Sequence, residues 1–249
     1  MDIDSFFELI EKALAGDASS QFELGKYFDR GNIVNQNYDQ AVYWYTKAAE
    51  QGDVKAQNNL GDCYYFGDGV EQDFQKAVYW YSKSAEQRDE VALYNLGLCY
   101  YKGLGIDQDY EKAINWYTKS AELGYTNAMV ALGYYYERVI KNQEKAVQLY
   151  REAAEQGNAF AQNNLGIFYE NGYCGEVDYD KAIYWYAKAA VQGIAEAQDN
   201  LGRCYKNGSG LNQNYEKAVY WLTKAAEQGN DLAIKRLSKL KKKGILSDE

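Results

Sequence analysis

The chain of 249 residues contains no histidine and no proline. Without histidine it lacks the commonest general base, the commonest metal ligand and the one side chain that titrates near neutral pH. Without proline, no helix is interrupted by a residue that cannot donate a backbone hydrogen bond. We therefore expect no catalytic residue, no metal site and no cofactor.

The sequence also has little positive charge and no long hydrophobic run. Its 36 acidic residues outnumber 27 basic ones, which gives a net charge of −9 and argues against a nucleic-acid surface. No stretch approaches the roughly 18 apolar residues of a membrane span, and the first residues, Met1 to Glu8, lack the positive start of a secretion signal. These features predict a cytoplasmic monomer that neither binds nucleic acid nor inserts into membranes.

Two short motifs recur along the chain with the same spacing. A Leu-Gly pair and a single alanine each repeat every 36 residues, with one shared interval of 33. The pairs begin at Leu24, Leu60, Leu96, Leu132, Leu165 and Leu201, and the alanines are Ala41, Ala77, Ala113, Ala146, Ala182 and Ala218. A period of 20 to 50 residues is typical of a stacked solenoid, which binds along an extended surface.

Residues 53–88 show the anatomy of one repeat. Ala56, Leu60 and Tyr64 mark the apolar face of a first helix, helix A, which the glycines of residues 67–70 end. Asp73 is placed to cap a second helix, helix B. The apolar face of helix B consists of Phe74, Ala77, Val78, Tyr81 and Ala85. Each repeat is therefore predicted to be a helical hairpin.

Glycine occurs at two further places in the repeat. A glycine inside helix A, such as Gly61, costs about 1 kcal/mol relative to alanine. We expect close approach of helix B to offset this cost, with the helix B alanines as the matching small surface. Most B helices are followed by a glycine, which favours the left-handed conformation of a helix end. These glycines are Gly52, Gly124, Gly157, Gly193 and Gly229.

The periodicity predicts one all-α solenoid with fourteen helices. It would begin with a capping helix in residues 1–16 and close with a capping helix and tail in residues 230–249. Between them lie six hairpins, in residues 17–52, 53–88, 89–124, 125–157, 158–193 and 194–229.

Three of the four cysteines share one place in the repeat. Cys63, Cys99 and Cys204 each follow the repeat leucine by three residues. Packed helices lie about 8–10 Å apart, whereas a disulfide needs Cα atoms within about 7 Å. We expect these thiols to be buried and reduced. Cys174 lies in a loop and is the one candidate for a reactive thiol, but no nearby basic residue in the sequence would activate it.

The repeat unit resembles the Sel1-like repeat, a relative of the tetratricopeptide repeat. The motif A-x-x-x-L-G-x-x-Y stands at residues 56–64, and the motif K-A-V-x-W-Y-x-K-x-A-E-Q stands at residues 76–87. The resemblance implies a right-handed α/α superhelical solenoid with the A helices on its concave side, and a scaffold or adaptor role. The fourth repeat departs from the motif, since it lacks the glycine loop and has Leu149 in place of tryptophan. Arg88 departs as well, because it replaces the glycine after helix B.

Helix A positions that vary between the repeats are candidates for partner binding. Most of them lie two before, two after or five after the repeat leucine, and aromatic residues such as those at 94, 101 and 134 are typical interface anchors. The candidates are Phe22, Tyr65, Tyr94, Leu98, Tyr101, Val130, Tyr134, Phe160, Ile167 and Arg203. Two interpretations stay open: these side chains line a concave groove, or Tyr65 and Tyr101 pack between neighbouring A helices.

The favoured function is a non-enzymatic scaffold that binds a peptide or protein partner in the concave groove. One alternative is a regulator or immunity-type protein that inhibits a single partner. A less favoured alternative is a β-lactamase-like or penicillin-binding enzyme, which some secreted, cysteine-rich relatives resemble. Those relatives have a disulfide in each repeat, and this chain lacks that pattern.

Overall fold

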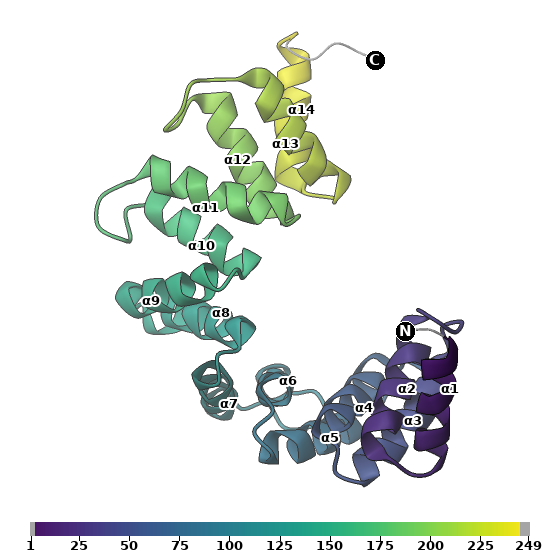
Figure 1. The fold of residues 1–249 in the computed structure, drawn as a ribbon. Helices are drawn as coiled ribbons and strands as arrows, with labels where there is room; N and C mark the ends of the chain where they lie inside the picture. Colours follow the sequence, from purple (N-terminus) through teal and green to yellow (C-terminus); the bar gives the residue numbers. More distant parts are fainter. Residues whose placement is uncertain (1–2, 245–249) are drawn as a thin grey trace. The chain divides into compact units, whose positions relative to one another are not determined.

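The computed structural model describes the backbone of residues 3–244 and the side chains from residue 4 onward. Over this range it contains fourteen α-helices, one π-helical turn and no strand (Figure 1). The fold class expected from the periodicity is thereby confirmed as all-α, with consecutive helices paired as hairpins.

Every predicted hairpin is present. The A helices are α2 (Ala18–Arg30), α4 (Val54–Phe66), α6 (Glu90–Lys102), α8 (Thr126–Tyr135), α10 (Ala159–Glu170) and α12 (Ala195–Asn207). The B helices are α3 (Tyr38–Glu50), α5 (Phe74–Glu86), α7 (Tyr110–Glu122), α9 (Gln143–Glu155), α11 (Tyr179–Val191) and α13 (Tyr215–Glu227). The expected capping helices are α1 (Ile3–Leu14) and α14 (Asp231–Lys242).

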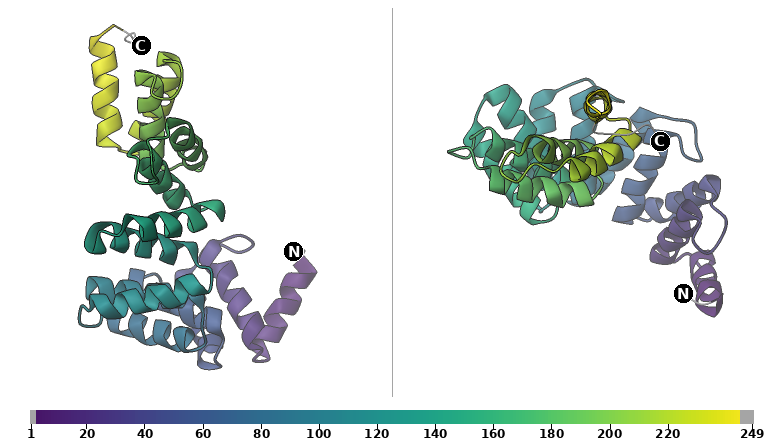
Figure 2. Two further views of the ribbon diagram at one scale, coloured as in Figure 1. Left: turned by 90° about the vertical axis from the view of Figure 1, so that its left-hand side faces the viewer. Right: turned by 90° about the horizontal axis from the view of Figure 1, so that it is seen from above.

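The chain forms two compact units, Met1–Ala128 and Met129–Glu249, called unit 1 and unit 2 below. In unit 1, α1 packs on α2, and the hairpins α2/α3, α4/α5 and α6/α7 pack in chain order. In unit 2, α9 packs on α10, followed by the hairpins α10/α11 and α12/α13, and α14 packs on α13. Figure 2 shows α14, in yellow, beside the green helices of unit 2.

The helix ends follow local sequence rules. Asp73 caps α5 as predicted, because its carboxylate accepts a hydrogen bond from the backbone N–H of Lys76 at 3.0 Å. The glycine after each B helix other than α5 has a positive φ, for example 94° at Gly52 and 96° at Gly193. Arg88 holds the same left-handed conformation, with φ 65°, without being glycine.

The glycine within helix A is explained by close approach of helix B, as expected, and in most hairpins a tyrosine ring lies nearest to it. An added Cβ at Gly61 would lie 2.6 Å from ring carbons of Tyr81, and one at Gly166 would lie 2.7 Å from Tyr186. The helix B tyrosine, one turn after the alanine, lies directly over the glycine. The helix B alanines also approach the glycine, since the carbonyl oxygens of Ala113, Ala182 and Ala218 would lie 3.2 Å from a Cβ added at Gly97, Gly166 and Gly202.

The hairpin of α8 and α9 departs from the others, as its shorter repeat predicted. Helix α8 is followed by a π-helical turn, η1 (Tyr136–Ile140), instead of a glycine loop. The turn ends at Lys141, whose φ is 61°, and Asn142 then caps α9. The three-residue deletion therefore shortens the connection between α8 and α9, and both helices still form.

The repeat cysteines are free and buried, as predicted. Burial raises the pKa of the Cys63 and Cys99 thiols to about 12 and that of Cys204 to about 11. These thiols serve as small apolar core residues next to the buried repeat leucines.

Within residues 3–244, no helix is long and apolar enough to cross a lipid bilayer.

Candidate partner-binding surface

The candidate residues divide between the two units. Phe22, Tyr65, Tyr94, Leu98 and Tyr101 belong to unit 1, and the other five belong to unit 2. Each set is considered within its own unit.

Three candidates lie on α6 in unit 1. Tyr94 is half-buried, with its ring centroid 5.4 Å from those of Tyr117 and Tyr125. Tyr101 is 41% exposed and meets the edge of Tyr110 at 5.4 Å. Leu98, which lies between these two tyrosines in the sequence, is half-buried. Helix α6 therefore carries a partly exposed row of aromatic and aliphatic groups.

Tyr65 on α4 makes contacts to its own hairpin and to the next one. Its ring centroid lies 5.4 Å from that of Phe74, and its hydroxyl accepts a hydrogen bond from Lys102 Nζ at 3.2 Å. The residue is half-buried. Tyr65 thus packs between the neighbouring A helices α4 and α6 and leaves part of its surface exposed. Its contacts therefore agree both with groove lining and with packing between A helices.

The third hairpin lacks a polar contact that four other hairpins make. In those hairpins the helix B tyrosine donates its hydroxyl to a carboxylate on helix A. The four bonds are Tyr45 to Asp29 at 3.2 Å, Tyr81 to Asp62 at 2.7 Å, Tyr150 to Glu137 at 3.0 Å and Tyr186 to Glu170 at 2.7 Å.

Tyr117 is the corresponding tyrosine of the third hairpin, and the part of the chain described here offers it no such carboxylate. The two acceptor positions hold Leu98 and Tyr101 instead. Burial raises the pKa of Tyr117, and the phenols of Tyr94 and Tyr101 add to this effect. On α6, an apolar and an aromatic side chain therefore occupy the positions where other A helices carry the acid that binds the helix B tyrosine.

The structure corrects the expectation for Phe22. This side chain is only 8% exposed, and its ring centroid lies 5.9 Å from that of Tyr45. Lys26 Nζ lies 5.2 Å from the same ring centroid. Phe22 belongs to the core of unit 1, because the neighbouring helix B tyrosine covers it.

The candidates of unit 2 have varied surroundings. Tyr134 and Phe160 are exposed, at 52% and 57%, and the guanidinium carbon of Arg138 lies 5.8 Å from the Tyr134 ring centroid. Val130 and Ile167 are half-buried. Of these five residues, Tyr134 and Phe160 offer the most open apolar surface.

Arg203, the fifth candidate of unit 2, has an internal partner. Its guanidinium donates two hydrogen bonds to the carboxylate of Glu170, both at 2.6 Å. Burial alone would raise the pKa of Glu170, but the hydrogen bonds from Arg203 and Tyr186 hold it below its usual value. Arg203 therefore joins α12 to α10 and is already neutralised.

The same register in unit 1 carries two acids, whose pairing across neighbouring repeats the sequence interpretation did not consider. Asp29 corresponds to Glu170, five after the repeat leucine, and Asp62 corresponds to Arg203, two after the next one. Asp62 accepts hydrogen bonds from Tyr81 and, at 3.3 Å, from Asn95. Burial raises the pKa of Asp62 to about 6, and the charge of Asp29 adds to this. Comparing positions between neighbouring repeats would have revealed both pairs.

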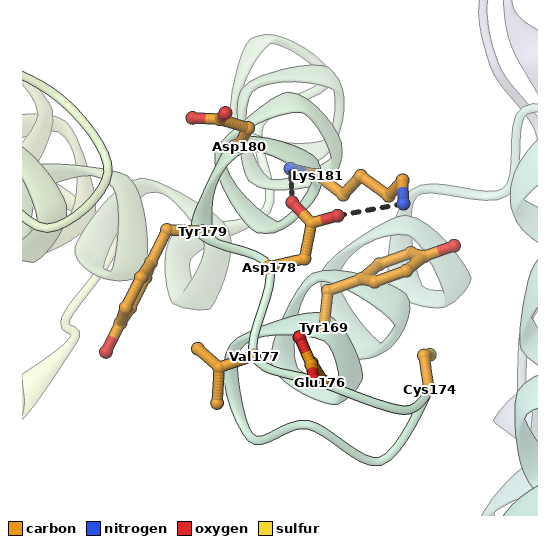
Figure 3. A pocket seen from close by; sticks show the side chains of 8 residues that line it. All are labelled: Tyr169, Cys174, Glu176, Val177, Asp178, Tyr179, Asp180 and Lys181. Atoms are coloured by element: carbon orange, nitrogen blue, oxygen red, sulfur yellow. Dashed lines mark hydrogen bonds and ion pairs between the residues drawn. The ribbon is translucent and has the colours of Figure 1, made fainter.

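The loop around Cys174 forms a surface cavity (Figure 3). Asp178 accepts a hydrogen bond from the Lys181 backbone at 2.9 Å and pairs with its ammonium group at 2.8 Å. Burial raises the pKa of Cys174, although Arg151 and Lys181 act in the opposite direction. The thiol is therefore not activated as a nucleophile.

No group of three or more histidine, cysteine or acidic side chains within residues 3–244 could hold a metal ion.

Sequence and structure comparisons place the chain among repeat proteins. The Sel1 repeat family matches residues 18–53, 54–89, 91–125, 126–158, 159–194 and 195–230. No functionally curated protein matches significantly. A Sel1 repeat protein from Oxalobacter formigenes is 34% identical over 90% of this chain and 97% of its own, with a TM-score of 0.79.

Two further solved structures are similar. The protective antigen c5321 of uropathogenic Escherichia coli is 32% identical over 94% of this chain, with a TM-score of 0.71, and the match spans 59% of that antigen. The immunity protein Pa5087 from Pseudomonas aeruginosa is 25% identical over 87% of this chain and 83% of its own, with a TM-score of 0.59. Six family matches along nearly the whole chain carry the conclusion: the chain belongs to the Sel1 repeat family.

Proposed function

We propose that this chain is a non-enzymatic scaffold that binds a protein partner on the A-helix surface of its third hairpin. That surface, called the α6 surface, consists of Tyr94, Leu98 and Tyr101 on α6 together with Tyr65 of the neighbouring helix α4. The supporting observation is the exchange at Leu98 and Tyr101, where other hairpins place a carboxylate that binds the helix B tyrosine. Tyrosine-rich, partly desolvated patches are typical of binding hot spots.

The stacking role of the repeat does not require this exchange. Four hairpins stack with the acid–hydroxyl bond in place, and the third stacks without it. A partner that buries Leu98 and Tyr101 would give these side chains a function that stacking leaves unexplained. Tyr134 and Phe160 are the corresponding exposed candidates of unit 2.

The test begins with capture of partners from the native cell and identification of the bound protein. Its dissociation constant is then measured for the wild type, Leu98→Asp and Tyr101→Ala, with Tyr79→Ala as a control on the helix B side. Tyr79 is 54% exposed and lies outside the α6 surface. We expect at least a roughly tenfold loss for Leu98→Asp and little change for the control. Equal affinity in all four proteins would refute the proposed surface.

A second candidate function is an immunity-type protein, which inhibits one partner. Its support is the likeness to Pa5087, a protein named as an immunity protein. The captured partner's own activity, or its toxicity on expression, would be measured with and without an equimolar amount of this chain. Inhibition would favour the immunity role, and unchanged activity in a stable complex would favour the scaffold.

A further inference from the structure

A cavity of about 400 Å³ opens in unit 1 between the end of α5 and the helices α6 and α7. Its apolar lining comes from Leu93, Trp116 and Leu123, and its rim includes Arg88 and Lys119. None of its lining residues belongs to the α6 surface. Three departures from the repeat pattern meet in this cavity.

The first departure is the loss of a polar link. In four hairpins a glutamine after helix B donates a hydrogen bond to a glutamine three before the repeat leucine. The bonds are Gln51 to Gln21 at 2.7 Å, Gln87 to Gln57 at 2.9 Å, Gln192 to Gln162 at 2.8 Å and Gln228 to Gln198 at 2.9 Å. In the third hairpin these two positions hold Leu123 and Leu93, so the cavity has an apolar lining.

The second departure is the loss of a tyrosine that packs on the equivalent tryptophans. Four other repeat tryptophans have a tyrosine immediately before them, packed edge-on with ring centroids 5.0 Å apart. Asn115 takes that position here. Lys119 Nζ lies 4.2 Å from the Trp116 ring centroid, which places a positive charge over the lining.

The third departure is Arg88, which holds a backbone conformation that disfavours L-residues. Its φ is 65°, and the six equivalent positions, including Gly16 after the first capping helix, hold glycine with φ between 82° and 99°. Arg88 is exposed and makes no ion pair with any residue between 3 and 244. Residues kept in such conformations often serve a function that offsets their cost.

We propose that this cavity binds an apolar side chain of a partner protein, with an adjacent carboxylate of that partner bound by Arg88. The apolar side chain would contact Leu93, Trp116 and Leu123, and the carboxylate would also face Lys119. Among the rim acids, Glu86 is already paired with Lys83 at 3.6 Å, and Glu122 also lies at the rim. This inference rests on the proposed function, since it assumes that the chain binds a protein.

The probe is the capped dipeptide acetyl-Leu-Asp-amide, titrated into the full ¹⁵N-labelled chain. Each of the five tryptophans contributes one indole N–H signal, and a Trp116→Phe variant identifies the relevant one. We expect the Trp116 signal to shift saturably, with a dissociation constant in the millimolar range for so small a ligand. Acetyl-Leu-Asn-amide, which differs only by its missing charge, should bind more weakly by about fivefold.

Trp44 provides an internal control. It lines a smaller cavity at the same register, where Gln21 replaces Leu93 and Gly16 replaces Arg88. The Trp44 signal should therefore stay unchanged. A Trp116 signal that does not move, or equal affinity for both dipeptides, would overturn the proposal.

The Arg88→Gly variant separates function from structure. It should raise Tm by roughly 2–4 °C, because it relieves the left-handed backbone, and weaken dipeptide binding about fivefold. The matched variant Gly52→Arg should lower Tm and gain no binding. An Arg88→Gly variant that binds the dipeptide as well as the wild type would show that Arg88 has no binding role.

The captured partner separates this inference from the proposed function. If Leu98→Asp weakens partner binding and Arg88→Gly does not, the α6 surface stands and the cavity proposal fails. If Arg88→Gly alone weakens binding, the cavity is supported and the α6 surface is not.

Discussion

Two hairpin boundaries, one in each unit, share their register and differ in their charge. Between α2 and α4, Asp29 and Asp62 take the two facing positions. Between α10 and α12, Glu170 and Arg203 take the same positions and form a bidentate ion pair. The helix B tyrosine binds the first acid in both places. The repeat therefore fixes where a side chain lies and leaves its charge free to vary.

The difference extends along unit 2. Asp199 on α12 is paired with Arg236 on α14, which joins the last hairpin to the capping helix. In unit 1 the neighbour of Asp62 on the next A helix is Asn95, an amide that only partly compensates the carboxylate. Unit 2 thus pairs its buried acids with arginines, whereas Asp62 in unit 1 has only hydroxyl and amide partners.

The largest predicted effect tests whether the shared scaffold is equally important in both units. Leu60 and Leu165 are fully buried at the same register, so Leu60→Ala and Leu165→Ala should each cost about 2–5 kcal/mol. Because repeats contact mainly their neighbours, the loss should be local. Hydrogen exchange should show lost protection in α4 and its neighbours for Leu60→Ala, and in α10 and its neighbours for Leu165→Ala. Uniform loss along the whole chain for either variant would contradict this.

The next effect concerns the unpaired acid of unit 1. The pKa of Asp62 is raised to about 6, above its unfolded value near 4, so its charge destabilises the fold as pH rises from about 4 to 6. Asp62→Asn removes this charge and keeps an acceptor for Tyr81. The variant should match the wild type in stability at pH 4 and exceed it by about 2 kcal/mol at pH 7. Denaturant unfolding at both pH values measures the difference, and a variant that is less stable at pH 7 would exclude this interpretation.

A smaller effect of opposite sign is expected for the paired acid of unit 2. The pKa of Glu170 is lowered, so its charge stabilises the fold above the unfolded value and this contribution disappears as pH falls below about 4. Glu170→Gln should therefore lower stability by about 1 kcal/mol at pH 7 and by less at pH 3. Denaturant unfolding at pH 7 and pH 3 measures this difference in stability. Arg203→Gln, which removes the other side of the ion pair, serves as the control. Opposite pH trends would show that the acid facing Asp29 destabilises the fold, whereas the acid facing Arg203 stabilises it.

The fold was predictable from local rules, whereas the site was predictable only in part. The cap at Asp73 and the glycine after each B helix depend on residues within three or four positions, and both predictions are confirmed. Close approach at Gly61 was predicted correctly, but its partner is Tyr81, because side-chain size on the facing helix decides the contact.

Contacts between neighbouring A helices were harder to predict. The ion pair of Glu170 with Arg203 joins residues 33 apart, and the burial of Phe22 depends on a tyrosine from helix B. A single repeat does not contain the first of these relations, and the second depends on how the two helices of one repeat pack together. The candidates at Tyr65, Tyr94, Leu98 and Tyr101 stay predictions, since their exposure and contacts agree with either interpretation.

The smallest predicted effect lies at the hairpin whose connection differs from the rest. Lys141 ends the π-helical turn with φ 61°, where other A helices end in glycines such as Gly67 and Gly103. Lys141→Gly relieves the left-handed backbone but adds freedom to the unfolded chain, so we expect a net gain of about 0.5 kcal/mol. Lys141→Ala keeps the unfavourable conformation and should leave stability unchanged. If Lys141→Ala raises the stability in thermal unfolding as much as Lys141→Gly does, the destabilisation at this position comes from the lysine side chain and not from the left-handed backbone.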